Sequence, residues 1–87
     1  MTTYAVKREL PGITLEQLAE AQKNVIATSK TMTADGTPIN YIRSNFFPED
    51  SSCTCLFEAG SARAVEQINE TVGVPYTEIC EVLDLAP

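Results

Sequence analysis

The stretch INYIRSNFFPEDSSCTCLFE, residues 39–58, predicts a β-hairpin. Residues 39–47 are rich in Ile, Tyr and Phe, and residues 53–58 form a second, shorter run that is apolar on both faces. The segment between them, 48–52, contains Pro, Asp and two Ser, which favour turns. Because a strand that is apolar on both faces is typical of a sheet interior, we place residues 53–58 in the centre of a sheet.

A strand and a helix are predicted before this hairpin. Residues 4–10 alternate apolar with charged side chains, and Lys7 and Glu9 share the polar face. A Pro-Gly pair then ends the strand. Thr14 and Gln17 form a capping-box pattern, and apolar positions follow at three-and-four spacing. We therefore expect an amphipathic helix of about four to five turns after Thr14.

A helix and a strand are predicted after the hairpin. Ser61 is placed to cap the helix, and Gly73 and Pro75 follow in the order that ends one. Residues 77–85 contain alternating apolar positions and form the fourth expected strand. The predicted order is strand, helix, strand, strand, helix, strand.

This order predicts a ferredoxin-like α+β sandwich. Right-handed crossovers place residues 4–10 between 53–58 and 77–85, and residues 39–47 pair on the outer side of 53–58. We expect one domain, residues 1–87, with a four-stranded antiparallel sheet and two helices on one face. The other face would then be open, and a second copy of the chain is the simplest cover, giving a homodimer.

Composition disfavours several classes of partner. Six Lys and Arg against twelve Asp and Glu give a net charge of -6, which repels nucleic acid and anionic lipid. The chain contains no His, the usual general base at neutral pH. It has no apolar run of the ~20 residues that span a bilayer. Three cysteines and a start without a secretion signal indicate a cytoplasmic protein.

Strand parity predicts where functional side chains gather. If the apolar positions face the helices, polar and aromatic side chains converge on the open face. The candidate ligand-binding residues there are Lys7, Glu9, Tyr41, Arg43, Glu58 and Glu81. The two cations could hold a carboxylate or phosphate group, or could form salt bridges with the three glutamates. The same surface could also be a dimer interface or a solvated face.

The cysteines leave three interpretations open. Cys53 and Cys55 share one strand face about 6.5 to 7 Å apart, a spacing that is awkward for a disulfide. They can be buried small hydrophobes. They can instead be a soft-metal or redox pair, completed by Cys80 or by a second subunit. A catalytic thiol would need Lys7 or Arg43 to lower its pKa.

Four segments carry a resemblance to a known family: YAVKRELPG at 4–12, YIRSNF at 41–46, TCLFEA at 54–59 and GVPYTEICEV at 73–82. With them the chain resembles, over nearly its whole length, short bacterial proteins catalogued as a domain of unknown function, whose named type is nickel-responsive and nickel-binding. The resemblance implies a ferredoxin-like fold, a homodimer formed through sheets (a dimeric α+β barrel) and, in some members, nickel held by His and carboxylate groups.

The chain departs from the family pattern at the residues that matter for metal. Arg43 stands where the family commonly has His, and Lys7 stands where it often has a carboxylate. Ile68 corresponds to a His often present on the second helix. Since a guanidinium cannot deprotonate to bind a cation, we expect no metal and no cofactor at these positions.

We therefore expect a homodimer that binds a small ligand, more readily an organic anion than a metal. The alternative function is a cofactor-independent enzyme of the cyclase or isomerase type, acting in a cavity of the dimer. There Arg43 or Lys7 would anchor an anionic group, Tyr41 would donate a proton and a glutamate would remove one. The residues assign no catalytic role beyond that sketch.

Overall fold

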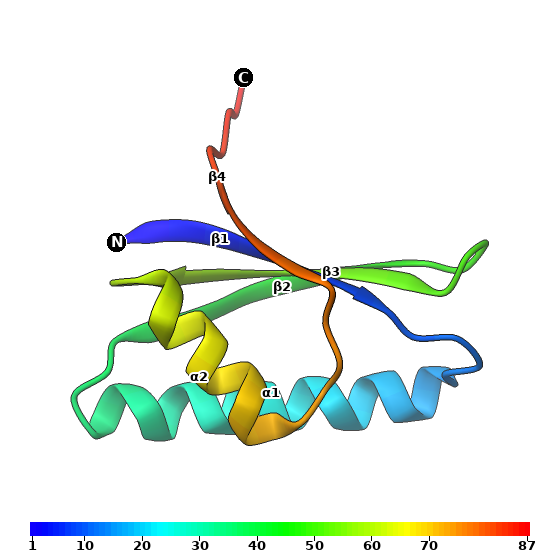
Figure 1. The fold of residues 1–87 in the computed structure, drawn as a ribbon, viewed down its shortest axis with the longest axis horizontal. Helices are drawn as coiled ribbons and strands as arrows, with labels where there is room; N and C mark the ends of the chain where they lie inside the picture. Colours follow the sequence, from blue (N-terminus) through cyan, green and yellow to red (C-terminus); the bar gives the residue numbers. More distant parts are fainter.

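The computed structural model describes all 87 residues and confirms the predicted order of elements (Figure 1). The six elements are β1 (Thr2–Glu9), α1 (Leu15–Ala34), β2 (Ile39–Phe47), β3 (Ser52–Ala59), α2 (Ala62–Val72) and β4 (Glu78–Val82). The strands pair in the order β2-β3-β1-β4, and all three pairings are antiparallel. The ferredoxin-like α+β topology predicted from the sequence is confirmed.

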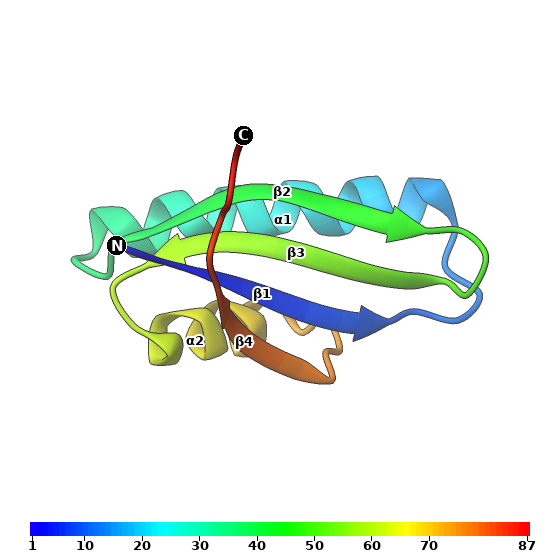
Figure 2. The same ribbon diagram turned by 90° about the horizontal axis from the view of Figure 1, so that it is seen from above.

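Both helices cover one face of the sheet, and no layer covers the other (Figure 1). Seen from above, α1 lies beneath β2, and α2 lies beside β4 on the other half of the sheet (Figure 2). The core fills the space between the two layers, and its largest fully buried side chains are Phe57, Ile39, Ile68, Val6 and Val65. The C-terminal tail rises from the uncovered face.

Both helices begin at the predicted capping residues, and α2 ends at the predicted glycine. The Thr14 hydroxyl accepts a hydrogen bond from the Gln17 amide at 3.1 Å, and the Gln17 side chain accepts one from the Thr14 amide at 3.0 Å. Ser61 caps α2, and Gly73 ends it in the left-handed region at φ 71°. Gly suits that position because it has no Cβ to clash there.

The fourth strand is shorter than predicted. β4 ends at Val82, which pairs with Thr3 near the start of β1. Beyond that point β1 offers almost no further partner residues, so the chain leaves the sheet. Leu83 and Leu85, expected in the strand, are 80% and 87% exposed.

The predicted orientation of Tyr41 is wrong, because β2 contains a bulge. Tyr41 pairs with Phe57, but Arg43 pairs with Leu56, so Ile42 is an extra residue in the strand. A bulge shifts the side-chain alternation by one residue. Tyr41 therefore points to the helices, together with Ser44, while Ile42 is 37% exposed.

The long helix α1 packs on the sheet with little burial. Only Val25 and Ser29 of its 20 residues are buried, whereas Leu15 in its first turn is 75% exposed. Neither α1 nor α2 is long and apolar enough to cross a membrane. The shallow packing of α1 leaves space beneath its first half.

We predict that Thr14→Ala lowers the free energy of unfolding by about 1 kcal/mol, the usual cost of a lost N-cap. Urea unfolding followed by circular dichroism measures the change. Thr71→Ala is the control, because the Thr71 hydroxyl bonds only the Gln67 carbonyl within α2. The control should stay within about 0.5 kcal/mol of the parent chain. An equal loss in both variants would contradict a capping role.

Candidate functional site

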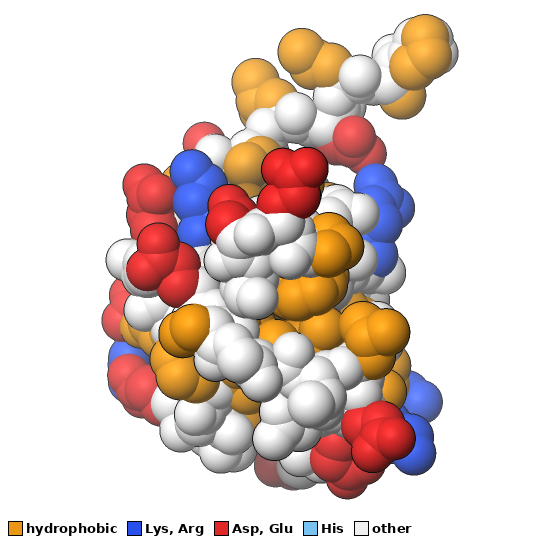
Figure 3. All heavy atoms as spheres, turned by 90° about the vertical axis from the view of Figure 1, so that its right-hand side faces the viewer, with side chains coloured by type: hydrophobic (Ala, Val, Ile, Leu, Met, Phe, Trp, Pro, Cys, Tyr) orange, Lys and Arg blue, Asp and Glu red, His pale blue; other side chains and the backbone are white.

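The space beneath the first half of α1 is a cavity of about 240 Å³ between that helix and the sheet. Its walls are mainly apolar, and they include Leu15, Leu18 and Val25 of α1 and Phe46 of β2. Figure 3 views the end of the molecule where α1 begins, and apolar atoms gather at the centre of that face with charged groups around them. Ligand sites commonly combine such apolar walls with a few polar groups.

The main polar group of the cavity is the guanidinium of Arg8, which is only 2% exposed. Its Nε donates to the Cys55 sulfur at 3.3 Å, and its Nη1 donates to the Val74 and Pro75 carbonyls at 3.2 and 3.3 Å. Its Nη2 is buried and has no hydrogen-bond partner. A buried donor without a partner is costly, so this nitrogen marks a place for an acceptor.

A chain of hydrogen bonds runs from α1 to the same cysteine. The Gln22 side-chain amide donates to the Tyr41 hydroxyl at 2.8 Å, which lies 2.6 Å from the Ser44 hydroxyl. Ser44 in turn donates to the Cys55 sulfur at 3.1 Å. All four residues line the cavity together with Arg8. The bulge in β2 makes this chain possible, because it turns Tyr41 and Ser44 to one side.

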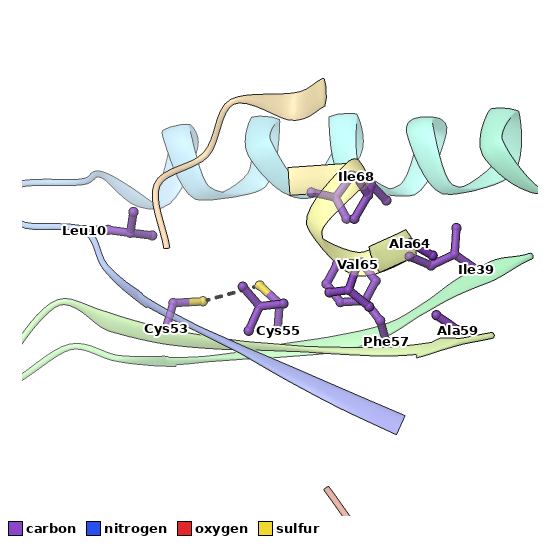
Figure 4. Packing of buried hydrophobic residues seen from close by; sticks show 11 residues of the cluster. Leu10, Ile39, Cys53, Cys55, Phe57, Ala59, Ala64, Val65 and Ile68 are labelled. Atoms are coloured by element: carbon purple, nitrogen blue, oxygen red, sulfur yellow. Dashed lines mark hydrogen bonds between the residues drawn. The ribbon is translucent and has the colours of Figure 1, made fainter. Parts of the chain in front are cut away.

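Cys53 and Cys55 lie side by side on the helix-facing surface of β3 (Figure 4). Their sulfur atoms are 4.0 Å apart, and both residues are buried. Cys80 pairs with Ala5 and lies on the opposite face of the sheet from Ile79, which packs on the core. The soft-metal interpretation allowed Cys80 to act as a third ligand beside Cys53 and Cys55. Within one chain Cys80 cannot do so, because it lies on the other face of the sheet.

The two thiols titrate as a pair, with opposite shifts. A hydrogen bond from Cys53 lowers the pKa of Cys55, and Arg8 and Ser44 lower it further, against the effect of burial. The pKa of Cys53 is raised by its bond to Cys55 and by burial. We assign the negative charge to Cys55, because Arg8 and Ser44 donate directly to its sulfur.

The predicted site residues do not form one cluster. Lys7 forms a salt bridge with Glu78 at 3.3 Å rather than with any of the three predicted glutamates. Arg43 pairs with Leu56 on the uncovered face and forms no salt bridge within the chain. Glu9 and Glu58 lie on that same face by register.

Two other predicted residues lie on the helix side of the sheet. Glu81 pairs with Tyr4 and shares the parity of Ile79, so the prediction that it adds a carboxylate to the uncovered face is wrong. Tyr41 lies on the helix side through the bulge. Tyr41 is thus separated by the sheet from Lys7 and Arg43, so the enzyme arrangement sketched from the sequence is not assembled within one chain.

Sequence reasoning missed Arg8, although a signal was present. Arg8 shares strand parity with Val6 and Leu10, which are both buried. A charged residue at a core-facing position is unusual unless it is paired or functional. Parity could therefore have singled out Arg8, whereas its partners at Cys55 and Val74 depend on contacts distant in sequence.

We predict a pH-dependent contribution of Cys55 to stability. Its folded pKa lies below the ordinary value of 9.0, so its contribution is complete above pH 9.0 and is lost as the pH falls toward the folded pKa. Between these limits, the free energy of unfolding should rise with pH more steeply in the parent chain than in Cys55→Ser. The slope attributable to one proton is at most about 1.4 kcal/mol per pH unit. Urea unfolding at several pH values below 9 measures it, and parallel profiles would contradict the assignment of the charge.

Comparison with known proteins places the chain in a family. The family model for nickel-responsive SCO4226-like proteins matches residues 4–82. The crystal structure of SCO4226 from Streptomyces coelicolor A3(2) is similar, with a TM-score of 0.81 and 27% sequence identity over 97% of this chain and 99% of that one. No curated protein sequence matched. The chain therefore belongs to the SCO4226-like family of nickel-responsive proteins.

Proposed function

We propose that the protein binds a small organic anion, with its charged oxygen on Arg8 and its apolar body in the cavity beneath α1. The observation that carries this proposal is the Nη2 atom of Arg8, which is buried without a hydrogen-bond partner. An anionic oxygen is the acceptor that a guanidinium binds most strongly. Ligand binding would satisfy a donor that the folded chain leaves unused.

The arrangement of Arg8 limits how the anion binds. The Nε of Arg8 already donates to Cys55, and its Nη1 donates to two backbone carbonyls. Only Nη2 is free to bind a ligand, so the anion cannot form two parallel hydrogen bonds with the guanidinium. The neighbouring Cys55 sulfur also offsets part of the arginine charge. We therefore expect modest affinity, to which burial of the apolar body in the cavity contributes most.

Nickel fits the single chain poorly. Divalent nickel favours four or more nitrogen and oxygen ligands, and imidazole is a common one. The chain has no His, and no three side chains of Cys, Asp or Glu gather as a metal site. Of the three positions that depart from the family pattern, Lys7 and Arg43 lie on the uncovered face and Ile68 is buried in the core. These features support an organic anion over nickel as the ligand of this chain.

The proposal includes a homodimer formed through the uncovered face of the sheet. Leu56 and Val82 are half-buried there, although no layer covers them. Leu83 and Leu85 extend from the same face and are exposed. A second copy would cover these apolar groups. Three cysteines without disulfides suit the reducing cytoplasm, which we propose as the compartment.

We predict that octanoate binds and that 1-octanol, which has the same chain length but no charge, binds roughly 10- to 100-fold more weakly. A hydrogen bond to a charged group contributes about 1.5 to 3 kcal/mol, which corresponds to that factor. Arg8→Met should lose octanoate affinity by a similar factor. Isothermal titration calorimetry measures each affinity.

Arg43→Met is the matched control, because Arg43 lies on the uncovered face of the sheet. It should bind octanoate like the parent chain. Circular dichroism checks that Arg8→Met is folded, and the octanoate and octanol comparison on the parent chain does not depend on that variant. Equal binding of the two probes by the parent chain would refute the proposed role of Arg8.

We predict a species of two chain masses in sedimentation equilibrium at micromolar concentration. Leu56→Glu should convert it to a folded monomer, because each buried unpaired carboxylate costs about 3 to 5 kcal/mol. Ile26→Glu is the control, since Ile26 lies on α1 and is 36% exposed. A folded monomer of the parent chain would contradict the dimer and leave the cavity proposal standing.

A further inference from the structure

We infer that Cys53 and Cys55 form a two-sulfur site for one copper(I) ion, with Arg8 as its charge partner. The inference does not depend on the proposed binding of organic anions, although both use the wall of the same cavity. It rests on the placement of two sulfur atoms, on the strand that holds them and on the buried guanidinium beside them.

The sulfur atoms are placed for a bridging ion. They lie 4.0 Å apart on the same surface of β3, so an ion midway between them would be about 2.0 Å from each. Thiolates keep about 2.3 Å from zinc, so a small outward rotation of either side chain gives room for an ion of similar size. No backbone movement is required.

The same strand geometry opposes a disulfide between these residues. Alternate residues of a strand are about 6.5 to 7 Å apart, at the upper limit of the roughly 4.4 to 6.8 Å found between the Cα atoms of a disulfide. β3 also pairs on both sides at this point, because Cys55 is opposite Val6 of β1 and Ser44 of β2. Contracting the strand would break those pairings. A bridging cation therefore fits the pair better than a covalent bond does.

The number of ligands selects the ion. Zinc usually takes four ligands in a tetrahedron. Here no third His, Cys, Asp or Glu joins the two sulfurs, and Cys80 lies on the far face of the sheet. Soft thiolate ligands bind copper(I) as well as zinc. Of these two ions, copper(I) is the one that accepts just two sulfurs, in a nearly linear arrangement. The site is thus complete for copper(I) and incomplete for zinc.

The charges balance in the buried site. Two thiolates and one copper(I) ion carry a net charge of minus one, and the guanidinium of Arg8 carries plus one. Its Nε already donates to the Cys55 sulfur at 3.3 Å. Burial penalises any uncompensated charge, so a neutral assembly is favoured. Each thiol that is protonated before binding releases its proton to solvent, and neither copper nor sulfur changes oxidation state.

The cavity supplies a route to the ion. It is lined by both cysteines and by Arg8, so copper(I) carried by a small exchanging ligand can reach the sulfurs without unfolding β3. The copper-loaded protein should bind octanoate more weakly, because the charge of Arg8 is then already compensated.

The test is an anaerobic titration of the reduced 87-residue chain with copper(I) held by the coloured chelator bicinchoninate. We expect the parent chain to take one copper per chain. Cys53→Ser and Cys55→Ser should each lose more than roughly 100-fold in affinity, beyond the 10- to 100-fold usual when a residue that only hydrogen-bonds to a metal ligand is changed. X-ray absorption of the copper-loaded parent chain should show two sulfur neighbours.

Cys80→Ser is the matched control and should bind copper(I) like the parent chain, because Cys80 faces away from the cavity. Circular dichroism verifies that the three variants are folded. Failure of the parent chain to take copper from the chelator would overturn the inference. So would unchanged affinity in either Cys53→Ser or Cys55→Ser, a loss in Cys80→Ser, or three or more ligands in the absorption spectrum.

Discussion

The buried guanidinium of Arg8 is the interaction on which the rest of the cavity depends. It joins β1 to the Cys55 sulfur on β3 and to the Val74 and Pro75 carbonyls in the segment between α2 and β4. These groups are far apart in the sequence, so one side chain links the sheet to the turn that leads into its edge strand. A buried charge needs partners, and Arg8 has three while one nitrogen remains without any.

The bulge in β2 decides which side chains share the cavity with Arg8. Without the extra residue, Tyr41 and Ser44 would point to opposite faces of the sheet. With it, both point to the helices and connect Gln22 of α1 to Cys55. Through the bulge, β2 contributes the Tyr41 and Ser44 hydroxyls to the wall of the cavity. Bulges often redirect side chains in this way beside functional sites.

The chain belongs to a nickel-responsive family, but its own side chains are poorly suited to bind nickel. The fold is retained over almost the whole chain, yet His is absent and two cations lie on the uncovered face. The polar groups that line the cavity together are an arginine, a glutamine, two cysteines, a serine and a tyrosine. In that set the guanidinium nitrogens can bind an anion and the cysteine sulfurs can bind a soft cation. Neither group replaces the imidazole that a divalent nickel ion favours.

The sequence by itself determined the order of elements, the strand order and both helix caps, because these depend on local periodicity, turn residues and a handedness rule. The sequence also places Arg8 on the same strand face as the buried Val6 and Leu10, which indicates that Arg8 is buried. Only the tertiary structure decided the bulge after Tyr41, the early end of β4 and the partners of Arg8. Each of these depends on register between distant strands, where a shift of one residue moves a side chain to the other face of the sheet.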